Sequence, residues 1–142
     1  MGKIFTITGV SGAGKSTLAR GFTLAIPGAK LIISITTRTP RVGDLHGEYS
    51  HVSVDEFREL EHEGKFLWTA QYGCTHYGTL VGAVDDVVAS STAVGVMILS
   101  PPGVRDLRHH LESGGDIGVH TPVFVTAPPR DEFINGMPIG LL

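Results

Sequence analysis

The chain has 142 residues, of which 42% are hydrophobic and 18% charged, and its formal net charge is −3. This size and composition are typical of one globular domain with a buried core. The acidic balance argues against a nucleic-acid partner, which would require a basic face, and no apolar run approaches the roughly 20 residues that cross a membrane. The lone Cys74 and the absence of a signal-peptide pattern favour a cytoplasmic protein, while nothing in the sequence specifies an oligomeric state.

Strands and helices are predicted to alternate along the chain. Strands are expected at residues 3–8, 31–35, 66–72, 94–99 and 122–127, where β-branched, aromatic or continuous apolar residues occur. Helices are expected at residues 15–26, after the capping-box sequence at 53–56, at 79–90, and around Val104, Leu107 and Leu111. This alternation predicts an α/β fold in which helices cover a parallel sheet.

A glycine-rich sequence follows the first predicted strand. It matches the phosphate-binding P-loop pattern completely and reads Gly9-Val10-Ser11-Gly12-Ala13-Gly14-Lys15-Ser16. The glycines let successive backbone N–H groups face one anion, and the following helix points its positive end at the same place. Lys15 is expected to reach the β- and γ-phosphates of ATP and Ser16 to bind Mg²⁺, with Thr17 next to them. The alternative is a glycine-rich turn without a ligand, which the strand–loop–helix context disfavours.

Two arginines and two tyrosines suggest a second phosphate site. Arg38 and Arg41 lie three residues apart on a proline-containing loop, and their planar guanidinium groups can hold one phosphate from two sides. Tyr49 and Tyr77 supply phenol hydroxyls, which are uncharged donors beside an anion. Surface charges are the alternative for the arginines, but a P-loop in the same chain favours phosphate binding.

These residues give the chain a resemblance to the guanylate kinase family. The runs TTRTPR, VSVDEF, GKF, AQY and YGT occur in the family's order, and the resemblance covers about residues 3–129. It implies a single P-loop NTPase-type domain: a core at 1–33 and 80–142 that binds ATP, and a small inserted lobe at 34–79 that binds GMP. The γ-phosphoryl group of ATP would be transferred to GMP.

The resemblance also implies roles for individual residues. The residues that would bind the GMP phosphate are Arg38, Arg41, Tyr49 and Tyr77. The residues that would lie near the guanine base are Ser34 and Thr79. Lys15, Arg38 and Arg41 would offset the charge of the reacting phosphates. Mg²⁺ on Ser16 would bridge the donor phosphates.

The chain departs from the family at three places. Trp68 stands where the family has a guanine-reading glutamate, and Ile98-Leu99-Ser100 replaces an Asp-x-Asp sequence that reads guanine and helps to organise Mg²⁺. After Arg130, the family's arginine-rich lid, next helix and closing strand are absent. Charged hydrogen bonds are worth about 1.5–3 kcal/mol each, so loss of the two guanine-reading acids should make the enzyme weakly selective for guanine. Loss of the lid arginines removes stabilisation of the charge in the transition state, so we also expect phosphoryl transfer to be slow.

Two other functions are compatible with the sequence. A kinase of ribose bisphosphates would not need the guanine-reading acids, and a catalytically dead binding module would not need the lid. The intact P-loop argues against the second. Trp68 is interpreted as a core or pocket-wall aromatic, with stacking on a base as the alternative. The histidines lack metal-ligand spacing, so no metal other than Mg²⁺ is expected.

Overall fold

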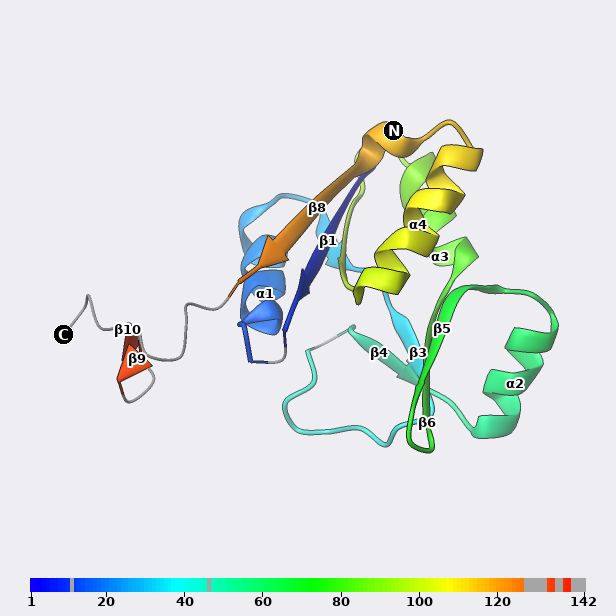
Figure 1. Cartoon of the computed structure of the whole chain (residues 1–142). Coiled ribbons are helices and arrows are strands. Elements are labelled where there is room, and N and C mark those ends of the chain that lie inside the picture. Colours follow the sequence, from blue (N-terminus) through cyan, green and yellow to red (C-terminus); the bar gives the residue numbers. More distant parts are fainter. Residues whose placement is uncertain (11, 46, 127–132, 135–136, 139–142) are drawn as a thin grey trace.

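The computed structural model of the chain describes residues 1–10, 12–45, 47–126, 133–134 and 137–138. Most of its strands form two four-stranded sheets, and the short strands β9 (Phe133–Ile134) and β10 (Met137–Pro138) form an antiparallel pair (Figure 1). Among the described helices, none has the length and apolar character that crossing a membrane requires.

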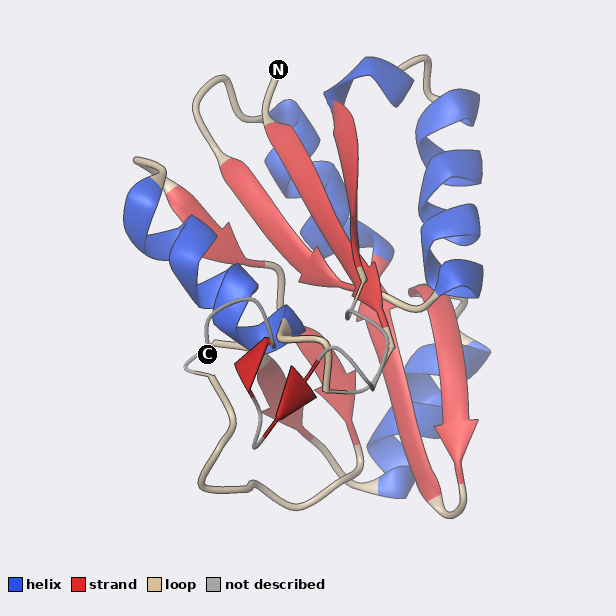
Figure 2. Ribbon diagram, turned by 60° about the vertical axis from the view of Figure 1, so that its left-hand side comes forward, coloured by secondary structure: helices blue, strands red, loops and turns tan. Residues whose placement is uncertain are grey.

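The first sheet is entirely parallel and forms the core of the domain. Its strands lie in the order β2-β7-β1-β8, with bounds Ala29–Leu31, Val94–Ile98, Lys3–Gly9 and His120–Val125. Helix α1 (Lys15–Ala25) covers one face, and α3 (Val81–Ala89) and α4 (Pro101–Ser113) cover the other (Figure 2). A 3-10 turn, η1 (Ile117–Val119), leads into β8. The predicted α/β fold with a helix-covered parallel sheet is confirmed.

Apolar side chains on both faces of the central strands explain this layering. In β1, Ile4 packs with Leu107 on the α3/α4 side, whereas Ile7 packs with Ala19 on the α1 side, and all four are fully buried. Successive side chains of a strand point to opposite faces, so a strand that is apolar throughout must be covered twice.

The second sheet belongs to a smaller lobe that the chain builds between β2 and α3. Its strands lie in the order β4-β3-β6-β5, with bounds Tyr49–His51, Ser34–Thr36, Thr75–Leu80 and Phe66–Tyr72. Helix α2 (Val54–His62) begins as the capping-box sequence predicts, because the Ser53 hydroxyl accepts a hydrogen bond from the N–H of Glu56 at 3.1 Å. The buried ring of Phe57 stacks on Phe66 at a centroid distance of 4.5 Å and fixes α2 to the lobe.

The prediction of one strand at residues 31–35 is wrong. Strand β2 ends at Leu31 in the core sheet, and β3 begins at Ser34 in the lobe sheet. The N–H of Ile32 donates to the Val96 carbonyl of the core, whereas the N–H of Ser34 donates to the Glu48 carbonyl of the lobe. Hydropathy cannot distinguish these partners, because the whole run is apolar or small.

Two predicted boundaries also need correction. The helix expected at 79–90 begins at Val81, because Thr79 is paired with Ser34 as part of β6. The last core strand spans His120–Val125 instead of 122–127, and residue 127 lies outside the described part of the chain. Strands β4 and β6 were not predicted, because their sequences are short or polar and their hydrogen-bond partners are distant in sequence.

A buried histidine at the start of β8 makes stability depend on pH. His120 Nε2 lies 2.8 Å from Oγ1 of Thr6, and burial, with a smaller effect from the Arg108 charge, lowers the pKa of His120. Below the ordinary histidine pKa of about 6.5, the unfolded chain binds a proton that the folded chain does not. His120 should therefore contribute fully to the free energy of unfolding above this pH. As the pH falls below it, the free energy of unfolding should decrease by at most about 1.4 kcal/mol per pH unit.

Denaturant unfolding at about pH 7.5 and about pH 5.5 measures this effect. We expect His120→Gln, which can still hydrogen-bond to Thr6, to show a flatter pH dependence than the wild type. His109 is exposed, so His109→Gln is the matched control and should keep the wild-type slope. Equal slopes in all three proteins would contradict the prediction.

Candidate active site

The P-loop connects β1 to α1 at the carboxyl end of the core sheet. A Cβ atom on Gly9 would lie 2.4 Å from the Val125 carbonyl oxygen, so glycine is needed where β8 approaches. Gly12 and Gly14 have φ angles of 82° and 91°, in the left-handed region that favours glycine. The loop turns between Val10 and Ala13, whose N–H donates to the Val10 carbonyl at 3.1 Å, and Ser11 lies outside the described residues.

The loop and the first turn of α1 enclose a pocket of about 390 Å³, here called the P-loop pocket, which is lined by Gly12, Gly14, Lys15, Ser16 and Thr17. The Lys15 ammonium donates to the Gly9 carbonyl at 2.7 Å, and Ser16 and Thr17 are exposed. Open glycine backbone, one cation and a helix N-terminus fit the phosphates of a nucleotide. In the described part of the chain no three acidic, histidine or cysteine side chains group to hold a metal, so a Mg²⁺ ion here would rely on Ser16 and on phosphate oxygens.

A second cavity of about 520 Å³, here called the interlobe cleft, lies between the P-loop and the lobe sheet. Lys15 lines both the P-loop pocket and this cleft, so the two spaces share this residue. The cleft is lined by Gly9, Lys15, Ser34, Tyr49, Trp68, Tyr72, Tyr77, Ile98, Leu99, Ser100 and Pro101.

The lobe side of the cleft is built from one row of residues across all four strands. Strand pairing places Tyr49 opposite Ser34, Ser34 opposite Thr79, and Thr79 opposite Trp68. Directly paired residues point to the same face of a sheet, and Tyr77, two residues before Thr79, shares that face. Thr79 is fully buried and is not among the residues that line the cleft, and its hydroxyl has no hydrogen-bond partner within the described residues. The register of the lobe sheet therefore brings four of the six predicted acceptor residues together.

Arg38 joins this group from the loop after β3. Its guanidinium donates to Oδ1 of Asp44 at 2.7 Å, and its Cζ atom lies 4.9 Å from the centroid of the Tyr49 ring. The Tyr49 and Tyr77 rings are 6.1 Å apart. The hydrogen bond raises the pKa of Arg38 and lowers the pKa of Asp44, which keeps both groups charged.

Arg41 occupies a different environment on the same loop. Its side chain is exposed, and only its backbone N–H bonds to Asp44, at 2.9 Å from Oδ2. Neither Arg41 nor Arg38 is among the residues that line the interlobe cleft. The structure thus gathers Arg38 with the tyrosines and leaves Arg41 at the surface of the loop.

Tyr49 is a neutral hydrogen-bond donor at physiological pH. Burial, followed by the nearby Glu48 carboxylate, raises the pKa of Tyr49 to about 12. A phenol that keeps its proton can donate to a phosphate oxygen without adding charge.

Sequence reasoning missed two residues of this site. Asp44 accepts a hydrogen bond from the Arg38 guanidinium. The one feature of the sequence that could have indicated this pairing is an acidic residue close to two arginines in the same loop. Tyr72 lines the cleft with its ring 5.8 Å from that of Tyr77, but it lies at the end of a predicted strand with no motif around it. Trp68 lies in the wall of the cleft and packs against the core, in agreement with its interpretation as a pocket-wall aromatic.

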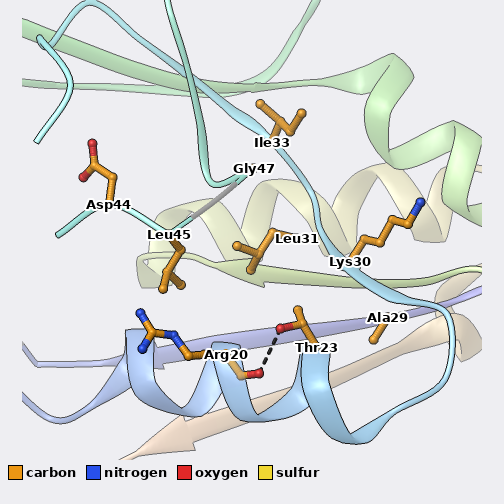
Figure 3. A pocket seen from close by; sticks show the side chains of 9 residues that line it. All are labelled: Arg20, Thr23, Ala29, Lys30, Leu31, Ile33, Asp44, Leu45 and Gly47. Atoms are coloured by element: carbon orange, nitrogen blue, oxygen red, sulfur yellow. Dashed lines mark hydrogen bonds between the residues drawn. The ribbon is translucent and has the colours of Figure 1, made fainter. Parts of the chain in front are cut away.

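A further groove, of about 640 Å³, lies elsewhere. It is bounded by α1, β2 and the loop that contains Asp44, and Figure 3 shows Leu31 and Leu45 between its walls, with Arg20 and Thr23 of α1 on one side. It shares no lining residue with the P-loop pocket or the interlobe cleft. We therefore do not assign the site chemistry to this groove.

Comparison with known proteins agrees with the geometry of the site. The family model for guanylate kinase matches residues 1–136. The chain is 34% identical to a guanylate kinase of Rubrobacter xylanophilus over 132 residues, which are 92% of this chain and 65% of the relative. It is 36% identical to a guanylate kinase of Trichormus variabilis over 124 residues, which are 87% of this chain and 62% of the relative.

A solved structure gives the same architecture. The crystal structure of guanylate kinase from Anaplasma phagocytophilum superimposes with a TM-score of 0.64 at 19% identity, covering 92% of this chain and 62% of that one. The chain spans less than two thirds of the length of these three proteins. With the family model matching nearly its whole length, the chain belongs to the guanylate kinase family.

Proposed function

We propose that the chain transfers the γ-phosphoryl group of ATP to GMP, producing ADP and GDP. The observation that carries this proposal is the position of Lys15, which lines both the P-loop pocket and the interlobe cleft. A cation at the junction of two phosphate sites is suited to the charge that moves between them. The similarity to guanylate kinases supports the same activity.

The acceptor phosphate would lie against Arg38, Tyr49 and Tyr77, facing the P-loop. A phosphate monoester has a second pKa of about 6, so its oxygen is ionised near neutral pH and needs no general base. This oxygen forms a bond to the γ-phosphorus of ATP while the bond from that phosphorus to the β–γ bridging oxygen breaks, and ADP leaves with the electron pair. The protein contributes position and charge, with Arg38 on the acceptor side and Lys15 on the donor side.

Mg²⁺ would be held by the Ser16 hydroxyl together with the donor phosphates, where it supplies charge neutralisation. The sequence Ile98-Leu99-Ser100 at the end of β7 lacks the strand-end aspartate with which the family helps to organise this ion. Alkyl side chains do not bind Mg²⁺, and a hydroxyl is a weaker ligand than a carboxylate. We therefore expect turnover below the ordinary kinase range of about 1–100 s⁻¹.

An ADP-release assay with a panel of acceptors tests the proposal. We expect GMP to raise ADP release above the background hydrolysis of ATP alone, in a Mg²⁺-dependent manner. A ribose phosphate is the second candidate acceptor, because none of the described residues that line the cleft is a carboxylate able to read a base. ADP release that ribose 1,5-bisphosphate stimulates and GMP does not would replace the proposed acceptor with a sugar phosphate.

A further inference from the structure

We propose that the acceptor site of this chain does not read the 2-amino group of guanine, and that Trp68 recognises the base through its ring face. Purine nucleoside 5′-monophosphates would then be selected by their phosphate and ring plane. This inference rests on the proposed function and specifies the substrate class of the same site.

The described lining of the interlobe cleft carries little charge. Of the eleven described residues that line it, Lys15 alone is charged, and none is an aspartate or glutamate. Guanine has two adjacent hydrogen-bond donors, the ring N1–H and the 2-amino group. A carboxylate is the group that pairs most strongly with such donors. The described lining of the cleft has no carboxylate.

The order of residues along the lobe row gives the acceptor an orientation. Tyr49, beside Arg38, stands at one end of the row, and Trp68 stands at the other, three strand spacings away. Three spacings of 4.7–4.9 Å amount to about 14 Å, which is comparable with the length of a nucleoside monophosphate. A phosphate held at Arg38 and Tyr49 therefore directs the base toward Trp68.

Trp68 offers this base an apolar surface and no hydrogen-bonding edge. The indole Nε1 atom is buried and has no partner in the described structure, while the ring lines the cleft and packs against the core cluster that contains Leu99 and Val104. Aromatic rings stack on nucleobases with little dependence on base identity, because every base has a π face.

The remaining polar groups near this end are hydroxyls. Ser34 and Ser100 line the cleft, and Ser100 makes no capping hydrogen bond although it is the N-cap residue of α4. A hydroxyl can donate to a carbonyl or accept from an amine, so it does not favour guanine over a purine without the amino group. The Thr79 hydroxyl, in contrast, is buried.

Intrinsic fluorescence tests the inference directly, because Trp68 is the only tryptophan of the chain. We expect GMP and inosine 5′-monophosphate, which keeps the 6-oxo group but lacks the 2-amino group, both to change the emission of Trp68. Their dissociation constants should agree within about fivefold. Binding of GMP that is about 30-fold tighter or more would overturn the inference.

Two variants of neighbouring residues sharpen the test, with binding measured by calorimetry. Trp68→Glu places a carboxylate in the cleft and should raise the preference for GMP over inosine 5′-monophosphate by about tenfold or more. Thr69 is exposed on the opposite face of β5, so Thr69→Glu adds the same charge outside the cleft and should leave the ratio unchanged. An equal ratio in the two variants would overturn the role of Trp68.

Trp68→Phe covers the case in which the glutamate variant does not fold. It keeps an aromatic face without the indole N–H, and we expect it to bind both nucleotides within about fivefold of the wild type. A selective loss of GMP binding in this variant would contradict stacking as the mode of recognition. Tight, selective GMP binding by the wild type would leave the proposed function standing and overturn only this inference. Failure of both nucleotides to bind would overturn both.

Discussion

Replacing Lys15 by alanine should reduce GMP-dependent ADP release by about 10²–10³-fold or more, a range typical of losing one preorganised charge contact in a transition state. Within the described residues the Lys15 ammonium makes one hydrogen bond, to the Gly9 carbonyl, and Lys15 lines both the P-loop pocket and the interlobe cleft. A bound phosphate has to displace only one neutral carbonyl to gain this cation. The same variant should lose most of its affinity for ATP.

Steady-state kinetics and calorimetry with ATP and Mg²⁺ measure the two effects. Lys30→Ala is a suitable control, because Lys30 is an exposed cation on β2 and lines neither the P-loop pocket nor the cleft. Thermal unfolding should be nearly unchanged in both variants, since Lys15 contributes only one partly exposed hydrogen bond to the fold. Wild-type nucleotide affinity in Lys15→Ala would refute the assignment of the donor site.

Arg38→Ala should weaken GMP binding by about 10–100-fold, and by more than Arg41→Ala does. The two arginines belong to one loop, but their surroundings differ. The Arg38 side chain is only 8% exposed, is held by Asp44 and lies over the Tyr49 ring, whereas Arg41 is exposed. A charge that is fixed in place and shielded from water contributes more to binding than a solvated one, which loses conformational entropy when it binds.

Arg38→Lys separates the effect of charge from that of shape. Lysine keeps the charge but cannot present two parallel donors, so we expect an intermediate loss of affinity. Calorimetric titration of GMP into the three variants gives the ranking. If Arg41→Ala is the more damaging change, the acceptor phosphate lies nearer the loop surface than we propose, and Arg38 serves mainly to hold the loop through Asp44.

The sequence predicted best those features that depend on neighbouring residues. The P-loop is a local structure, because its glycines, Lys15 and Ser16 follow one another in the chain. The central strands were found for a similar reason, since β1 is rich in β-branched and aromatic residues and β7 is a continuous apolar run, both of which favour a buried strand. The capping box at Ser53 also acts within one helical turn.

Features that depend on distant partners were missed or misplaced. Nothing in the run that contains Ile32 and Ile33 shows that the chain leaves one sheet and enters another there. The pairing of Arg38 with Asp44 arises from the path of an irregular loop, which has no periodicity to detect. The row from Tyr49 to Trp68 requires the register of four strands, and that register is fixed by tertiary contacts. The resemblance named most of these residues but gave no positions for them.

The path of the chain into and out of the lobe has a consequence for how such a protein can diversify. The lobe sheet is entered at Ser34 and left after Leu80, and Ser34 is the direct partner of Thr79 across β3 and β6. Their Cα atoms are therefore about 5 Å apart, a gap that a tight turn can close. An inserted segment whose two ends lie side by side can be exchanged as a unit, because its replacement does not change the order of the strands in the core sheet. Under the proposed function, replacement of this one contiguous gene segment would change the acceptor, while the P-loop core stays the same. Leu67 and Trp68 of β5 and Leu45 of the loop after β3 pack against that core, so they would have to be matched in a transplanted segment.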